Sequence, residues 1–503
     1  MPNACPPPPR TTTVSDSRYP NDFTGQYIAG QWRPGSAGTL LQDRNPYDQS
    51  LLTEIANASR ADLDAAYRSA AAVQRDWARA LPRERAAVFL RAAEVIERRH
   101  AEIVDWLIAE SGSTRLKAEM EWGALRADAL AAATMPSRVA GRILPVDIAG
   151  KESRVYRSPL GVVGVISPWN WPLHLSSRSV APALALGNGV VLKPAEDTPV
   201  TGGLLLARIY EEAGLPPGLF NVVVGQVGEI GDAFTLHPIP KFISFTGSTR
   251  VGRRIGELAV SGPRLKRVGL ELGGNAPCVV LDDADLERAV TGAIVGRFLH
   301  QGQICMSSNR IIVQAPLYDR FVEAFVERAR GLKVGDPNLA DTVIGPLINA
   351  RQLQAATQRL AAAQAEGQRQ VLGGAPIGQV LPPQVFVDVA NDSALAQTEQ
   401  FCPIAPLIRA ADEEDALRMA NATEFGLSSA VFTGDAARGL RFAQRIEAGM
   451  THINDISPND DPSAMFGGEK NSGIGRFNSD WIIDEFTTDH WISVQHQAYA
   501  APF

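Results

Sequence analysis

Short apolar runs alternate with helical segments through the middle of the chain, and this alternation restricts the fold more than any other feature. The apolar runs occupy residues 162–166, 190–192, 220–224 and 242–245. Between the second and third runs the spacing predicts a helix over 202–213, which Gly214 ends and Pro216 follows. Strands that alternate with helices form βαβ units around a parallel sheet. The sequence therefore predicts an α/β protein.

A second alternating region predicts a second α/β domain. Its expected elements are a strand at 278–281, a helix at 284–299, a strand at 310–313 and a helix at 318–330. Upstream, the alanine-rich segment 60–110 has apolar residues at helical spacing and is interrupted by Pro82, which predicts two amphipathic helices. Two strand-like segments, 154–157 and 491–495, lie outside both sheets and could pair with each other or with another subunit.

The composition indicates a folded, multidomain protein without a nucleic-acid partner. Its 503 residues include 48 basic and 55 acidic side chains, with no dense run of Lys and Arg. The cysteines at positions 5, 278, 305 and 402 form no disulfide framework and have no metal-ligand spacing, so we expect a reducing cytoplasm and no metal site. No apolar run has membrane length. Residues 1–10 are proline-rich, and a disordered tail is expected over 1–22.

A cysteine and a glutamate, each framed by glycine, point to covalent chemistry. Gln-Gly-Gln-Ile-Cys ends at Cys305, and Glu-Leu-Gly-Gly begins at Glu271. A thiol that attacks a carbonyl and a carboxylate that activates water are what hydrolysis through a thioester requires. Each motif alone is weak evidence, because a cytosolic cysteine is more often a small buried hydrophobe than a nucleophile.

Three further motifs lie at the ends of predicted strands. Residues 245–252, Phe-Thr-Gly-Ser-Thr-Arg-Val-Gly, follow a strand and open a helix, whose N-terminal amides could hold a pyrophosphate. Lys193 and Glu196 follow another strand, where a carboxylate can bind ribose hydroxyls, although a solvated loop pair would have the same sequence. Asn170, within Pro-Trp-Asn-Trp-Pro, could donate to an oxyanion or hold a turn between packed tryptophans.

The order and spacing of these motifs resemble the NAD(P)-dependent aldehyde dehydrogenase superfamily. The matching motifs are PWNWP, KPAE, FTGS, ELGG, GQIC, EQFCP at 399–403 and FGGEKNSG at 466–473. The resemblance covers roughly residues 28–495. It implies a Rossmann-type NAD-binding domain (23–141 and 160–273), a catalytic α/β domain (274–480) and a β oligomerisation element (142–159 and 481–503). A homodimer or homotetramer is then expected.

The resemblance also implies four catalytic roles. Cys305 would attack the aldehyde carbonyl, and the Asn170 amide with the Cys305 backbone N–H would stabilise the oxyanion. Glu271 would activate the water that releases the acid, and its presence favours a free carboxylic acid over transfer to coenzyme A. Lys193 would contact the adenosine ribose and support the site.

A cofactor site follows from the same resemblance. The expected contacts are Ile166, Ser167, Pro168, Trp169, Lys193, Glu196, Gly225, Phe245, Gly247, Ser248, Val251, Leu272, Glu399 and Phe401. A carboxylate at Glu196 would repel a ribose 2′-phosphate, which favours NAD and leaves NADP as the alternative. Cys402 departs from the family pattern, which has glycine at this position.

The aldehyde site is expected to be apolar and aromatic. The residues that match or neighbour the family's tunnel are Trp171, Leu175, Phe298, Ile304, Met306, Ile456 and Phe466. Several segments are similar to the benzaldehyde and vanillin dehydrogenase branch, which favours an aromatic aldehyde. The alternatives are an aliphatic aldehyde or semialdehyde with the same mechanism, and a non-catalytic nucleotide-binding or structural protein. His174 and Arg178 differ from the tunnel residues of many relatives, and the sequence assigns them no role.

Overall fold

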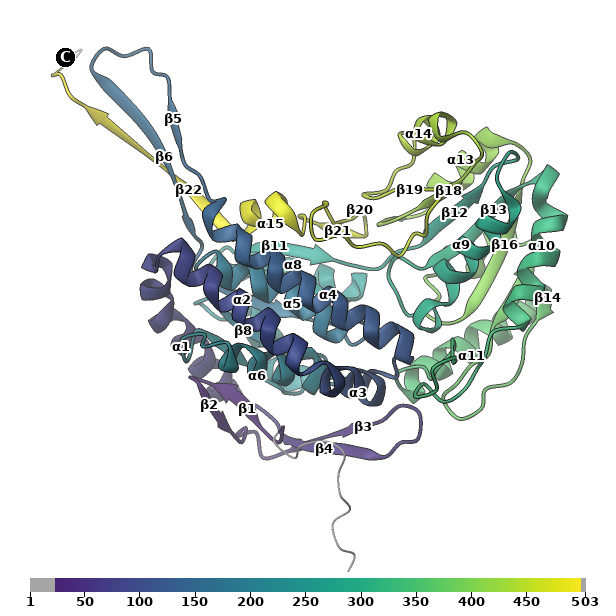
Figure 1. Cartoon of the computed structure of the whole chain (residues 1–503), viewed down its shortest axis with the longest axis horizontal. Coiled ribbons are helices and arrows are strands. Elements are labelled where there is room, and N and C mark those ends of the chain that lie inside the picture. Colours follow the sequence, from purple (N-terminus) through teal and green to yellow (C-terminus); the bar gives the residue numbers. More distant parts are fainter. Residues whose placement is uncertain (1–22, 499–503) are drawn as a thin grey trace, which may run out of the picture.

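Two α/β bodies form the protein, and a β arm projects from the first of them (Figure 1). This computed structural model describes residues 23–498, so the expected tail at 1–22 lies outside the described residues. The first body contains an eight-stranded sheet and the second a seven-stranded sheet. The predicted α/β class is confirmed.

The first sheet has the strand arrangement of a dinucleotide-binding fold. Its order is β2-β1-β9-β8-β7-β10-β11-β21. The parallel strands are β7 (Val162–Ile166), β8 (Gly189–Lys193), β9 (Phe220–Val222), β10 (Phe242–Thr246) and β11 (Arg267–Glu271). The antiparallel strands are β1 (Gln26–Ile28), β2 (Gln31–Arg33) and β21 (Gly473–Ile474). Successive strands add outward in both directions from β7, and open α/β sheets bind ligands at the carboxyl ends of strands at such a switch point.

Helices cover this sheet, and its central strands are buried except for Ile166 at the end of β7. The helices of this body are α1 (Arg60–Arg79), α2 (Pro82–Arg98), α3 (His100–Ser111), α4 (Arg115–Thr134), α5 (Pro172–Ala185), α6 (Leu205–Glu212), α7 (Asp232–Leu236) and α8 (Thr249–Ser261). Of these, α1, α5, α6 and α8 contact the strands, and α2 packs on α4, α5 and α6. The segment 60–110 therefore holds parts of three helices rather than the two expected. The sequence hides the break at Arg99 because no glycine or proline marks it.

The second sheet has the order β14-β15-β16-β13-β12-β18-β19. Its strands are β12 (Ala276–Val280), β13 (Ser308–Gln314), β14 (Arg369–Leu372), β15 (Gln384–Val387), β16 (Ile404–Ala410), β18 (Ala430–Phe432) and β19 (His452–Ile453). The helices of this body are α9 (Leu286–Phe298), α10 (Ala315–Arg330), α11 (Ala350–Ala365), α12 (Ala394–Gln397), α13 (Glu413–Asn421) and α14 (Ala436–Ala443). The predicted strand, helix, strand and helix between 278 and 330 correspond to β12, α9, β13 and α10.

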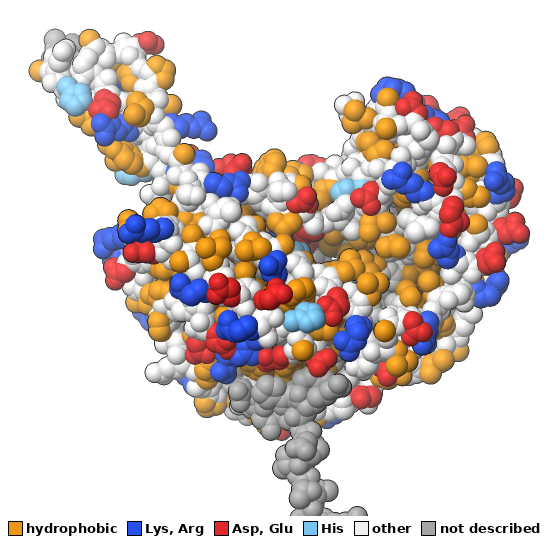
Figure 2. Space-filling view, in the orientation of Figure 1, with side chains coloured by type: hydrophobic (Ala, Val, Ile, Leu, Met, Phe, Trp, Pro, Cys, Tyr) orange, Lys and Arg blue, Asp and Glu red, His pale blue; other side chains and the backbone are white. Residues whose placement is uncertain are grey.

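The arm consists of β5 (Arg142–Leu144), β6 (Lys151–Pro159) and β22 (Thr487–Gln495). Strand β22 pairs with β6 in antiparallel register along its whole length. The two strand-like segments outside the main sheets thus pair with each other within one chain. Ile143 and Trp491 on the arm are 77% and 61% exposed, and hydrophobic side chains are visible along it in Figure 2.

The chain crosses between the two bodies twice. It leaves the first sheet after Glu271 and enters the second at Ala276. After β19 it forms β20 (Glu469–Lys470), which pairs with the earlier strand β17 (Phe425–Gly426), and it returns as β21, where Gly473 pairs with Glu271. The expected domain boundary at 480 therefore comes after the chain has already rejoined the first sheet.

Two small elements complete the described chain. They are the hairpin β3 (Leu40–Arg44) and β4 (Leu51–Ala56), and the helix α15 (Ser479–Phe486) that leads into the arm. No helix within residues 23–498 combines the length and apolar character needed to cross a membrane. Nor does this part of the chain contain a cluster of His, Cys, Asp and Glu side chains suited to a metal ion.

Candidate active site

Two cavities meet at Cys305, and residues of both bodies line each of them. Their volumes are about 270 and 220 Å³. Cys305, Asn170 and Leu175 line both of them. A group bound in one cavity can therefore approach the same thiol as a group bound in the other.

A sharp turn after α9 presents Cys305 to this junction. His300, Gln301 and Gly302 have left-handed backbone conformations, with φ of +50°, +58° and +73°. Such conformations cost a non-glycine residue roughly 1–3 kcal/mol and persist only where the surroundings enforce them. The buried Arg297 supplies that support, because its Nη2 donates to the Gly302 carbonyl oxygen at 3.0 Å.

Cys402 takes part in the same support. Its carbonyl oxygen accepts a hydrogen bond of 2.9 Å from Arg297 Nη2, and its side chain is buried. Burial raises the pKa of the Cys402 thiol, with Arg359 and Arg297 opposing that effect. The residue that departs from the family pattern is thus a packing residue beside the turn that precedes Cys305.

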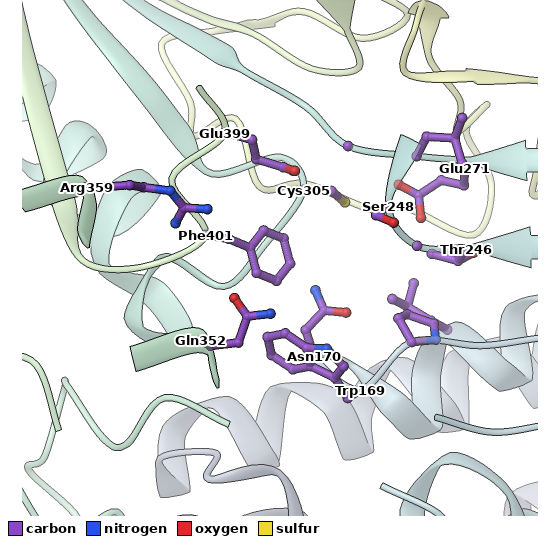
Figure 3. A pocket seen from close by; sticks show the side chains of 15 residues that line it. Trp169, Asn170, Thr246, Ser248, Glu271, Cys305, Gln352, Arg359, Glu399 and Phe401 are labelled. Atoms are coloured by element: carbon purple, nitrogen blue, oxygen red, sulfur yellow. The ribbon is translucent and has the colours of Figure 1, made fainter. Parts of the chain in front are cut away.

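The thiol and the carboxylate identified from sequence lie together at the junction (Figure 3). Burial raises the pKa of Cys305 well above its usual value, and the Glu271 carboxylate adds to this, while Arg178 opposes it. Burial also raises the pKa of Glu271, which is 1% exposed, against the effect of Arg178. Perturbed groups of this kind in a cleft are typical of catalytic sites.

Glu271 keeps one oxygen for chemistry. Its Oε2 accepts from Arg178 Nη2 at 3.2 Å, whereas its buried Oε1 has no hydrogen-bond partner among residues 23–498. A carboxylate with a raised pKa and a free oxygen can act as a general base toward water.

Asn170 lies beside Cys305 at the carboxyl end of β7. Its Nδ2 donates to the Gln303 carbonyl oxygen at 2.9 Å, and its side chain is buried. That bond uses one of the two amide hydrogens and holds the side chain against the loop that carries Cys305. The second hydrogen is available to an oxygen that develops charge at the thiol.

The larger cavity has much of the predicted cofactor site in its wall. The predicted residues that line it are Pro168, Trp169, Gly247, Ser248, Leu272, Glu399 and Phe401. The Trp169 and Phe401 rings meet edge to face, with centroids 5.4 Å apart, as Figure 3 allows the reader to follow. The remaining predicted contacts are not among its lining residues: Ile166, Ser167, Lys193, Glu196, Gly225, Phe245 and Val251. Gln352 and Arg359 of α11 line this cavity without having been predicted.

The donors and acceptors near this cavity suit a dinucleotide. Lys193 is 3% exposed, yet its Nζ makes only one bond in the described structure, a long one of 3.4 Å to the Pro194 carbonyl oxygen. A buried ammonium so poorly satisfied has donors left for ribose hydroxyls. Glu196 Oε1 accepts from the Val227 N–H at 2.8 Å, which leaves Oε2 as an acceptor. Ser248 precedes α8, whose N-terminal amides suit a phosphate.

The smaller cavity has one apolar and one polar side. Five of the seven residues expected at the aldehyde site line it: Trp171, Leu175, Ile304, Met306 and Phe466. Two predicted residues do not. Phe298 ends α9 and is fully buried in the core of the second body, 6.0 Å from the Phe325 ring of α10, and Ile456 is half-buried outside the lining. The polar side consists of His174, Arg178, Asn459 and Asp460.

Sequence reasoning gave these polar residues no role. His174 and Arg178 are four residues apart on α5, so they share one helix face, and this spacing was the available signal. Their acidic partner Asp460 comes from the loop after β19, and no local pattern connects it to α5.

Comparison with known proteins agrees with this geometry. The profile of the aldehyde dehydrogenase family matches residues 32–492. The chain belongs to the aldehyde dehydrogenase family. A vanillin dehydrogenase from Corynebacterium glutamicum is 52% identical to this aldehyde dehydrogenase, and the match covers 94% of this chain and 98% of the relative. The benzaldehyde dehydrogenase YfmT from Bacillus subtilis is 48% identical over 96% and 99%.

Solved structures lead to the same family. The crystal structure of an NAD-dependent benzaldehyde dehydrogenase from Corynebacterium glutamicum has a TM-score of 0.88 and 50% identity to this aldehyde dehydrogenase, over 95% of this chain and 98% of that one. The predicted family and enzyme class are confirmed: the chain is an NAD(P)-dependent aldehyde dehydrogenase.

Proposed function

We propose that this aldehyde dehydrogenase oxidises an aromatic aldehyde to the free carboxylic acid, with NAD as acceptor and a thioester on Cys305 as intermediate. The observation that carries this proposal is the position of Cys305 at the junction of two cavities. One has polar groups suited to a dinucleotide, and the other has an aromatic and apolar side.

The residues at the junction divide the reaction between them. Cys305 Sγ attacks the aldehyde carbon, and the Asn170 amide with the Cys305 backbone N–H stabilises the resulting oxyanion. When the oxyanion collapses to the thioester, the former aldehyde carbon loses a hydride, which a nicotinamide held in the larger cavity would accept. Glu271 then takes a proton from water as the water attacks the thioester, and the carboxylic acid leaves as Cys305 is regenerated.

The substrate and cofactor preferences rest on named side chains. Trp171 and Phe466 give the smaller cavity two aromatic surfaces, which favour a flat aromatic ring. The similarity to vanillin and benzaldehyde dehydrogenases supports the same choice. The Glu196 carboxylate disfavours a 2′-phosphate, so NAD is preferred over NADP.

The β arm favours association of subunits. Exposed apolar side chains on β5 and β22 favour pairing with a neighbouring subunit, in a homodimer or a homotetramer.

Cys278, Cys305 and Cys402 are free thiols, which suits the reducing cytoplasm.

A substrate and cofactor panel tests the proposal. The kcat/KM values for benzaldehyde, vanillin, hexanal and succinic semialdehyde are measured with NAD and with NADP. We expect the highest values for an aromatic aldehyde with NAD, and no turnover in Cys305→Ala. A preference for hexanal or succinic semialdehyde would select the aliphatic alternative, and turnover without the thiol would overturn the mechanism.

Thiol labelling separates an enzyme from a non-catalytic relative of the same fold. Cys278 is the matched control, because it is fully buried in the core of the second body, whereas Cys305 is partly exposed and lines both cavities. Iodoacetamide should label Cys305 faster than Cys278, and benzaldehyde with NAD should protect Cys305. Equal labelling of the two thiols would favour the non-catalytic alternative.

A further inference from the structure

Five ionisable side chains form a continuous row, and three of them, His174, Arg178 and Asp460, line the smaller cavity. Four of the five are buried, and the Asp460 side chain is 14% exposed. His174 Nδ1 lies 3.1 Å from Asp128 Oδ2, and His174 Nε2 lies 3.0 Å from Asp460 Oδ2. The same Asp460 oxygen accepts from Arg178 Nη1 at 3.2 Å. Arg178 Nη2 in turn donates to Glu271 Oε2, also at 3.2 Å. The charges alternate along the row, which ends at the proposed base.

One oxygen of Asp460 serves two cations. Burial opposes the charged form of His174, but Asp128 and Asp460 outweigh burial and raise the pKa of His174 to about 10. Burial likewise opposes the charge of Asp460, yet His174 and Arg178 hold the pKa of that carboxyl well below its usual range. His174 neutralises part of the negative charge of Asp460. The positive charge of Arg178 can therefore also stabilise the Glu271 carboxylate.

Aromatic rings hold Arg178 in place between the two carboxylates. Its guanidinium carbon lies 4.2 Å from the Phe466 ring centroid and 4.8 Å from that of Phe477. The residue is 2% exposed, so water cannot take over the role of a lost carboxylate partner.

We propose that Asp460 and His174 are positioning residues, which fix the Arg178 guanidinium against Glu271 and whose charges set how readily Glu271 and Cys305 ionise. The inference rests on the proposed roles of Glu271 and Cys305. Asp460 lies in the loop after β19, whereas His174 and Arg178 belong to α5. The second body thus supplies the charge that balances an arginine of the first.

Other charged groups around the catalytic pair are present in the variants and in the wild type alike. Glu399 faces Cys305 and Glu271 from the segment before β16. Burial and the Glu271 carboxylate raise the pKa of Glu399 to about 7, while the hydrogen bond that it accepts from the Gly274 N–H lowers it. Asp128 faces His174 from α4 and acts on Arg178 over a longer distance. A difference between variant and wild type therefore reports the substituted charge.

Two neutral substitutions change the local charge in opposite directions. His174→Gln removes a positive charge, so Asp460 draws on Arg178 alone, and Cys305 and Glu271 should ionise at higher pH. Asp460→Asn removes a negative charge, so both groups should ionise at lower pH. We expect each midpoint to move by about one pH unit, which is a tenfold change in rate on the rising limb.

Because the pKa of Cys305 is raised, the rate of its alkylation by iodoacetamide is measured from about pH 6 upward until the rate stops rising. The pH of half-maximal rate is the thiol midpoint, and Cys278 is the internal reference. This measurement needs neither aldehyde nor NAD. The pH dependence of kcat with benzaldehyde and NAD then gives the midpoint of the base. If the wild type oxidised no aldehyde, the proposed function would be overturned. The alkylation rates of Cys305 in the wild type and the variants could still be compared, so this inference would still be tested.

A neutral neighbour provides the control. Asn478 Nδ2 donates to Asp460 Oδ1 at 2.7 Å, and its φ of +66° is one that glycine adopts readily. Asn478→Gly removes this bond without a change of charge, so kcat should fall while both midpoints stay in place. If these residues had only a structural role, all three variants would lose kcat and none would shift the midpoints according to its change of charge.

Opposite shifts in His174→Gln and Asp460→Asn support the proposal. Shifts in the same direction, or unmoved midpoints, overturn it. If one of these variants does not fold, the other still decides, because the direction of its shift is fixed in advance. Asp460→Glu, which keeps the charge, should return the midpoint to that of the wild type.

Discussion

The carbonyl oxygen of Cys305 lies 2.2 Å from the point that a Cβ atom on Gly274 would occupy. The first crossing between the bodies is thus packed directly against the backbone of the nucleophile. No side chain fits between them, and the glycine of the Glu-Leu-Gly-Gly motif has a steric reason to be there.

Gly274→Ala should therefore displace Cys305. We expect kcat to fall at least about tenfold and the free energy of unfolding to fall by about 1–3 kcal/mol, as in other overpacked sites. Gly123 on α4 is the control, because a Cβ there meets no atom within 4 Å. Gly123→Ala should leave kcat unchanged and stabilise the helix by up to about 1 kcal/mol. Thermal unfolding and kcat measured on both variants check this, and equal effects would contradict it.

Replacement of Glu271 should separate the two halves of the reaction. Glu271→Gln retains the shape of the side chain but cannot take a proton from water, so hydrolysis of the thioester should slow by about 10²–10⁴-fold. A rapid burst of NADH followed by slow turnover is then expected in stopped-flow absorbance. Mass spectrometry should find the acyl group on Cys305, and an unmodified thiol during turnover would argue against the role.

Removal of the Asn170 amide should lower kcat more than it changes KM. The amide is expected to bind the oxyanion more strongly than the aldehyde, and one lost donor of this kind typically costs about 10²–10³ in kcat. Steady-state kinetics of Asn170→Ala with benzaldehyde and NAD measure this. A variant in which only KM rises would place Asn170 in ordinary substrate binding.

His174 should make stability depend on alkaline pH. Its folded-state pKa of about 10 lies above the usual value of about 6.5, so its stabilisation is complete below about pH 6.5 and is lost as the pH rises through about 10. Between about pH 7 and pH 10, the Tm of the wild type should fall more than that of His174→Gln. Calorimetry on both proteins would show this, and parallel Tm profiles would contradict it.

Charge on the arm should weaken subunit association. Ile143 on β5 and Ile492 on β22 are exposed, and lysine at both positions would place charge in the proposed interface. Sedimentation velocity should then show smaller species than for the wild type. Leu265, exposed outside the arm, is the control, and Leu265→Lys should sediment as the wild type does.

Local pattern explains which elements the sequence could predict. Strand β7 is buried on both faces and reads as a continuous apolar run, so its position was predicted to the residue. Strand β21 has two residues and no periodicity, and only its pairing with β11 makes it a strand. Phe298 was misplaced because sequence does not tell whether a residue at the end of a helix faces a core or a cavity.

The site residues likewise fall into those that local motifs could identify and those that only the fold brings together. Cys305, Glu271 and Asn170 belong to compact motifs and could be identified from them. Asp460 is 282 residues from Arg178, and an ion pair of that separation exists only through the folded arrangement of the two bodies. Burial, which raises the pKa values of both Cys305 and Glu271, is likewise a property of the fold.

The second crossing makes the C-terminal part of the chain a separable piece of the enzyme. The strands β21 and β22 are held by pairing with β11 and β6, so a cut in the loop after β19 would leave these pairings in place. Two fragments produced separately on either side of that loop retain complementary edges through which they can reassemble. Activity would then return only on mixing, because the smaller fragment carries the Gly473 edge that pairs with Glu271.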